Sequence, residues 1–142
     1  MNIDLATAQS IITQALATGQ EHGFKPLTVV VLDAGGHVIA VSRQDGASNN
    51  RFDIAQGKAY GALALGMGSR AIMERAEQQA YFIAAATAAL AGRLIPVPGG
   101  VLVRDDDGTI KGAVGISGDT SDNDETAAAT AIKAAGLTAQ VA

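Results

Sequence analysis

The stretch from Pro96 to Asp124, "PVPGGVLVRDDDGTIKGAVGISGDTSDND", contains the signals that decide the fold. Two apolar runs, at residues 100–104 and 109–117, flank the turn sequence "DDDG", and this pattern indicates an antiparallel hairpin. Ser121 then stands in a capping position with Asp124 three residues on, which predicts a helix from about Asp122 to Ala135. We therefore expect a hairpin that leads directly into a helix.

The remainder of the chain predicts the same kinds of element. Apolar residues at helical spacing follow Asp4 and indicate a helix that ends at Gly19. The segment "LTVVVLDAGGHVIAVSR" at residues 27–43 predicts a second hairpin with "DAGG" at its tip. Helices are predicted at residues 52–66 and 69–92, the latter either continuous or interrupted, and the last few residues are expected to fray.

This order of elements predicts an α+β domain in layers, because short hairpins separated by helices bury their apolar faces in that way. A Rossmann fold is disfavoured, since these turns are too short for parallel crossovers. A length of 142 residues fits one domain, 1–142.

Composition excludes several classes of function. A net charge of −4 and an aromatic content of 4% argue against a nucleic-acid partner. The absence of Cys excludes disulfides and thiolate metal sites. No signal-peptide pattern opens the sequence, and the longest apolar run, Ala80 to Gly92, is too short to span a bilayer. We expect a cytoplasmic protein without a membrane segment.

Small and charged residues in the predicted helix 52–66 stand out. Gly57 and Gly61 lie four apart on one face, so another backbone can approach closely, either within the domain or from another subunit. Lys58 is expected to pair with a buried carboxylate such as Asp33, to bind a substrate carboxylate, or to reach solvent. Arg43 ends a strand, and its planar guanidinium suits either an ion pair or a ligand carboxylate.

The acidic residues near the last helix allow two interpretations. Asp119, Asp122 and Asp124 surround a helix N-terminus, where carboxylates cap free amides and gain typically about 0.3–1 kcal/mol from the helix dipole. Alternatively, the same segment forms a ligand pocket in which an Asp accepts hydrogen bonds from the ligand. The "DDDG" turn lacks the other ligand positions of a calcium loop, and no spacing in the chain predicts a metal site.

The two histidines, His22 and His37, are explained most simply as a helix-end or loop residue and an exposed turn residue. Haem requires only one imidazole and an apolar slot, so both remain candidate haem ligands.

Four fragments point together to one family: "VVVLDAGGHVIAVSRQDGA", "IAQGKAYGAL", "IPVPGGVLV" and "GAVGISGDTSDNDETAA". In this order, over about Leu27 to Ile132, the chain resembles the haem-degrading, GlcG/HbpS-like family, which includes the C-terminal domain of PduO-type corrinoid adenosyltransferases. The resemblance implies a profilin-like α/β/α sandwich around a five-stranded antiparallel sheet. It also implies a homo-oligomer built from dimers, up to an octamer, which would give the Gly57 and Gly61 face a use.

The resemblance further implies a ligand pocket near the "PVPGG" and "GISGD" segments, with haem as the named cofactor and His22 as the nearest match to the family's histidine ligands. The pocket residues implied in this way are Asp33, Arg43, Lys58, Gly99, Gly100, Ser117, Gly118, Asp119 and Asp124.

Three functions remain open on the sequence. The first is a protein that binds a small ligand, such as haem. The second is a cofactor-independent catabolic enzyme, a lyase, isomerase or hydrolase, in which Lys58 or Asp119 acts as acid or base and Arg43 binds a substrate carboxylate. The third is an accessory subunit without chemistry, in which these residues only pack and cap.

Overall fold

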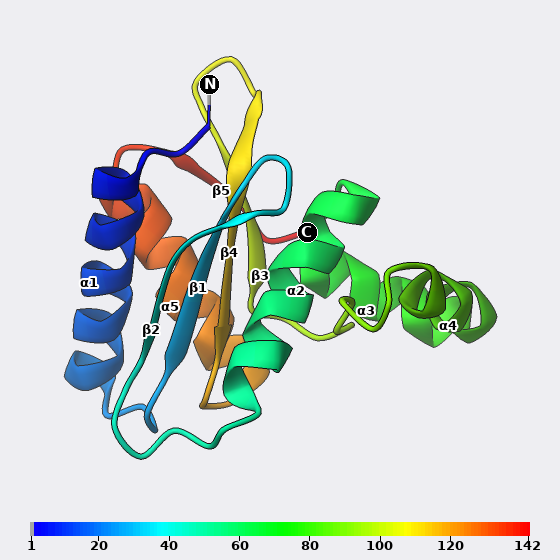
Figure 1. Ribbon diagram of the computed structural model, residues 1–142, viewed down its shortest axis with the longest axis horizontal. Helices are drawn as coiled ribbons and strands as arrows, with labels where there is room; N and C mark the ends of the chain where they lie inside the picture. The colour runs from blue at the N-terminus through cyan, green and yellow to red at the C-terminus, as the bar shows by residue number, and fades with distance from the viewer. Residues whose placement is uncertain (1) are drawn as a thin grey trace.

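The computed structural model describes residues 2–142 and contains a five-stranded antiparallel sheet in the order β2-β1-β4-β3-β5. The strands are β1 (Thr28–Asp33), β2 (Val38–Arg43), β3 (Gly100–Arg104), β4 (Ile110–Ser117) and β5 (Thr138–Gln140). The helices are α1 (Leu5–His22), α2 (Arg51–Leu65), α3 (Ser69–Gln78), α4 (Ala80–Ala89) and α5 (Ser121–Ala134). Figure 1 shows α1 and α5 on one face of the sheet and α2 on the other, with α3 and α4 extending outward. The predicted α+β sandwich is confirmed.

Alternation along the strands divides the core into two layers. Val29 and Val31 of β1 pack with α1 and α5, whereas Val30 and Leu32 of the same strand pack with α2. All four side chains are fully buried. Burial of an aliphatic side chain of this size contributes about 1.5–3 kcal/mol, so both layers stabilise the sheet.

Glycines bring α2 close to its neighbours within the domain. A Cβ atom on Gly57 would lie 2.6 Å from Ile95 Cγ1, and one on Gly61 would lie 3.1 Å from Leu94 Cγ. Of the two uses predicted for this face, packing inside the domain is therefore the observed one. The expectation that it serves contacts between subunits is wrong, because residues 94–95 already cover it.

Two helix ends differ from the sequence prediction. Helix α1 does not end at Gly19 but continues to His22 and ends at Gly23, whose φ of 71° is left-handed. Gly19 is instead a packing position, because a Cβ there would lie 2.9 Å from Leu27 Cδ1. Helix α5 is capped by Thr120 rather than Ser121, since Thr120 Oγ1 accepts a hydrogen bond from Asn123 N at 3.2 Å.

The predicted helix at 69–92 is interrupted at Gln79, whose φ of −137° lies outside the helical region. The chain end does not fray: residues 138–140 form β5, which pairs with β3. Three residues are too few for a recognisable alternating pattern, and the strand forms because β3 offers a free edge. No helix within residues 2–142 combines the length and the apolar character needed to cross a membrane.

Candidate functional site

A buried ion pair lies at the end of the sheet where β1 begins and β4 ends. Lys58 Nζ of α2 is 3.2 Å from Asp124 Oδ2 of α5, and it also donates a hydrogen bond to Ile116 O at 2.8 Å. The side chains of Lys58 and Asp124 are 2% and 1% exposed. The pair thus joins two helices that cover opposite faces of the sheet.

Glycines of the "PVPGG" segment make room for this lysine. Gly99 has a φ of 120°, and a Cβ there would lie 2.8 Å from both Lys58 Nζ and Ile116 O. At Gly100, a Cβ would overlap the backbone of Lys58. Gly99 and Gly100 therefore accommodate α2 itself.

Burial controls the protonation of the pair. Loss of solvation is the largest influence on both groups: it lowers the pKa of Lys58 and raises the pKa of Asp124, although each charge favours the other. The positive charge of Arg51 further lowers the pKa of Lys58. Asp124 is held in place by a second bond, since its Oδ1 accepts from Asp119 N at 2.9 Å.

Asp119 connects the loop between β4 and α5 to the segment before β1. Its Oδ1 accepts from Lys25 N at 2.8 Å and its Oδ2 from Asn123 Nδ2 at 2.7 Å. These bonds, the one from Lys25 first, lower the pKa of Asp119. A general base works best with a pKa near the working pH, and the pKa of Asp119 moves in the opposite direction.

Asp33 lies at the opposite end of the sheet, so the predicted Lys58–Asp33 pair is wrong. In the β1–β4 register Thr28 is opposite Ser117 whereas Asp33 is opposite Gly112, and five residues of strand span about 17 Å. Asp33 Oδ1 instead accepts from the backbone N atoms of Gly35 and His37, each at 2.9 Å. It stabilises the "DAGG" turn, and the His37 ring, which is 83% exposed, lies 3.3 Å from it.

A row of polar residues crosses three strands near the ion pair. Arg43, Thr28 and Ser117 are direct neighbours on β2, β1 and β4, and because register partners share a face they all lie on the α2 side. Arg51 Nη1, at the start of α2, donates to Ser117 Oγ at 3.0 Å. Thr28 Oγ1 is buried and has no hydrogen-bond partner among the described residues.

Sequence reasoning missed Arg51 and Thr28. Two features of the sequence could have pointed to them. Arg51 is a cation directly before the helix predicted from residue 52, and Thr28 is the single polar residue in "LTVVV". Neither signal gives the strand register that brings them together.

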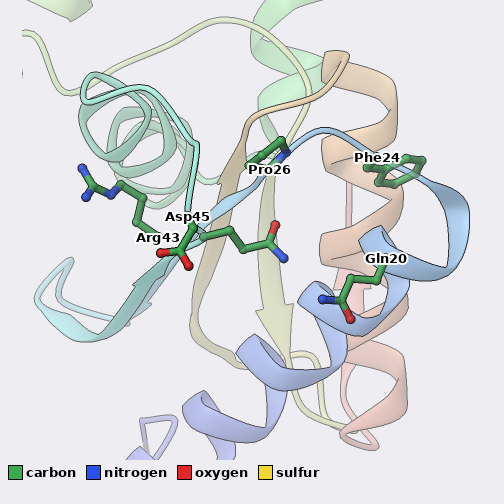
Figure 2. Close-up of a pocket in the computed structure, with 6 residues that line it drawn as sticks. Gln20, Phe24, Pro26, Arg43 and Asp45 are labelled. Carbon is green, nitrogen blue, oxygen red and sulfur yellow. The ribbon is translucent and has the colours of Figure 1, made fainter.

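An open groove and a smaller cavity adjoin this row. The groove, of about 520 Å³, is lined by Gln20, Phe24, Pro26, Arg43, Gln44 and Asp45. Figure 2 shows Gln20 and Phe24 on one side and Arg43 and Asp45 on the other, with Arg43 extending away from the helix α1 side. The cavity, of about 200 Å³, is lined by Lys25, Pro26, Gly46, Ala47, Ser48, Arg51 and Gly118. Pro26 is shared, so the two spaces are adjacent.

His22 lies at the same end, in the last turn of α1 rather than after it. Its Nδ1 lies 2.8 Å from Thr18 O, and because a carbonyl only accepts, this nitrogen carries the proton. In the neutral ring Nε2 is then free to bind a metal ion. The ring packs beside Phe24, with centroids 5.3 Å apart. Among residues 2–142 no three His, Cys, Asp or Glu side chains come close enough to hold a metal ion by themselves.

Comparison with known families identifies the chain. A model described as "Haem degrading protein HbpS-like" matches residues 3–133. The chain belongs to the HbpS-like family. The match covers helices α1 to α4, all but the last residue of α5, and four of the five strands. The family suggested by the four sequence fragments is thereby confirmed. No curated protein matches the chain.

Solved structures share the fold of this HbpS-like chain at low sequence identity. The PduOC–haem complex has a TM-score of 0.86 at 23% identity, covering 96% of this chain and 97% of that one. The Klebsiella pneumoniae protein ORFY has a TM-score of 0.84 at 26% identity, with 94% and 90% covered. A double mutant of Streptomyces reticuli HbpS has a TM-score of 0.80 at 24% identity, with 94% and 87% covered. These likenesses confirm the fold.

Proposed function

We propose that this HbpS-like protein binds haem, or a similar planar anionic ligand, at the groove beside the end of α1. The observation that carries the proposal is the state of His22: its Nδ1–H is held by Thr18 O, and Nε2 is left as a ligand. A hydrogen bond of this kind to the second ring nitrogen is the usual support of a metal-bound histidine. The family and the haem complex of PduOC support the same ligand.

The residue types around the groove match the chemical groups of haem. Phe24 and Pro26 offer apolar surface in the groove, and His22 packs against Phe24. Arg43 lines the opposite side of the groove and is a cation that a haem carboxylate would have to reach across it. Haem, when bound, supplies a redox-active iron. The chain's part is to hold it, and Gly118 of the "GISGD" segment lines the adjacent cavity. The "PVPGG" glycines act beneath this surface, by seating Lys58.

A haem titration tests the proposal. Wild-type protein should develop a Soret band that saturates, and His22→Ala should abolish or shift it. His37→Ala is the matched control, since His37 lies at the opposite end of β1 and its ring faces Asp33. Wild-type protein without a saturable Soret band would overturn haem binding, and equal spectra in both variants would overturn ligation by His22.

The catabolic-enzyme hypothesis has less support. Lys58 is enclosed with both of its partners inside the protein, and hydrogen bonds lower the pKa of Asp119. These observations do not support either group as the acid or base of a reaction.

We also propose a cytoplasmic homo-oligomer based on dimers. Helix α4 supports the oligomer, because it carries no charged residue, packs mainly against α3, and exposes 75% of Tyr81. Native mass spectrometry together with an absorbance scan would report assembly and bound haem in one experiment, and a monomer at all concentrations would contradict the oligomer.

A further inference from the structure

We propose that the first turn of α2 forms a separate binding site for a small oxyanion, a carboxylate or a phosphate, with Arg51 as its main cation. This site goes beyond the haem proposal and does not depend on it.

Arg51 is a half-buried cation without a counterion. Its single side-chain hydrogen bond within residues 2–142 goes to Ser117 Oγ, and none of the described carboxylates forms an ion pair with it. Arg70, by contrast, pairs with both Asp122 and Glu125. A guanidinium has five N–H donors in a planar fork that matches carboxylate and phosphate oxygens. Most of the donors of Arg51 are therefore available to a ligand.

Thr28 provides the second, independent observation. It is completely buried, and its Oγ1 has no partner within the described chain. Such a hydroxyl is unusual, because burying it without a hydrogen bond costs free energy. Thr28 precedes Val30 by two positions, and Val30 packs with α2, so the Thr28 side chain lies on the α2 side, beside Ser117 and behind the cavity lining. A donor is thus held unused next to the residue that binds Arg51.

The cavity in front of Arg51 has the matching charge. Its lining includes Lys25 and Arg51 but no carboxylate. The start of α2 has no side-chain cap from Asn50, although the Arg51 amide donates to Ser48 O at 3.2 Å. The positive end of the helix dipole adds to the charge of this cavity. Two acids lie close in sequence to these residues. Asp119 accepts from Lys25 N and Asn123 and its charge also interacts with that of Lys25, and Asp53 is exposed. An oxyanion would accept from the Arg51 guanidinium, with Lys25 providing a second cation.

Amide NMR shifts of the ¹⁵N-labelled protein test the site. Acetate and inorganic phosphate are titrated separately at pH 7 and constant ionic strength, with chloride as the balancing salt. We expect saturable shifts confined to Thr28, Ser48, Arg51 and Gly118. The anion that saturates at lower concentration identifies the ligand class. Shifts that do not saturate, or that spread over the whole surface, would overturn the proposal.

Variants separate the site from general charge effects. Arg51→Gln should weaken binding at least about tenfold. Lys133→Gln, which removes the same charge from the last turn of α5, should leave binding unchanged. If Arg51→Gln does not fold, Lys25→Gln on the exposed rim and Thr28→Val in the interior replace it, and each should weaken binding severalfold. Equal affinity in these variants would contradict the site. Because no haem is present, failure of the haem proposal leaves this result unaffected.

Discussion

Helices α2 and α5 begin at the same end of the sheet, on opposite faces, and their N-termini are built in opposite ways (Figure 1). At α5 the protein supplies its own acceptors: Thr120 caps the helix, and Asp124 accepts from the backbone of the preceding loop. At α2 no side chain caps the helix, and a cation without a counterion stands there instead. The acidic N-terminus of α5 therefore finds its hydrogen-bond partners within the protein. The N-terminus of α2, with the sequence "SNNRF", is left open for a ligand.

Breaking the ion pair between Lys58 of α2 and Asp124 of α5 should have the largest effect on stability. Lys58→Met leaves Asp124 buried without its counterion, and breaking a buried pair in this way costs about 3–5 kcal/mol of unfolding free energy. Urea unfolding at neutral pH measures it.

The double variant Lys58→Met with Asp124→Asn is the control. Removal of the remaining charge should make its loss clearly smaller than the sum of the two single losses. Additive losses, or a loss below about 1 kcal/mol for Lys58→Met, would show that the charges do not interact as the 3.2 Å separation implies.

A pair of cap variants compares the two helix starts directly. Thr120→Ala removes the bond to Asn123 N and should cost about 1 kcal/mol of unfolding free energy. Asn50→Ala removes no side-chain cap bond and should stay within about 0.5 kcal/mol of wild type. Thermal unfolding of both variants in anion-free buffer measures the difference. Equal losses would mean that the two starts are capped alike.

The smallest effect should be a change in how the free energy of unfolding depends on pH when Asp119 is replaced. The pKa of Asp119 lies below its ordinary value of 3.8 in the folded protein, so its contribution to stability is present above that pH and is lost as the pH falls. The pKa of Asp124 is raised from the same value, so its contribution has the opposite sign and declines as the pH rises through its folded pKa.

Asp119→Asn should therefore unfold with a shallower loss of stability between neutral pH and pH 3, as followed by circular dichroism. An unchanged or steeper slope would contradict the assigned role of the hydrogen bonds from Lys25 and Asn123.

Local signals were sufficient for most of the fold. The hairpin at residues 100–117 and the helix behind it follow from turn residues and apolar spacing within one stretch of sequence, and both are present. The three-residue strand β5 was missed, because its only support is the edge of β3, far away in the sequence.

The candidate site was harder to predict, because it depends on register. The sequence indicated that Lys58 needs a carboxylate, and it has one, but the partner is Asp124 and not Asp33. The partner of Lys58 is Asp124 because β4 ends beside Lys58 and leads directly into α5. The row of Arg43, Thr28 and Ser117, to which Arg51 is bonded, depends in the same way on which residues of β2, β1 and β4 face each other.

The pairing of β1 with β4 has a consequence for synthesis on the ribosome. Lys25 and Asp119, which close this end of the sheet, are 94 positions apart, so β1 can pair with β2 early but must wait for β4 to emerge. Until then the early hairpin has a free edge made of "VVVL", the kind of edge on which nascent chains associate wrongly. The rate at which the middle of the chain is translated should therefore influence the yield of native protein.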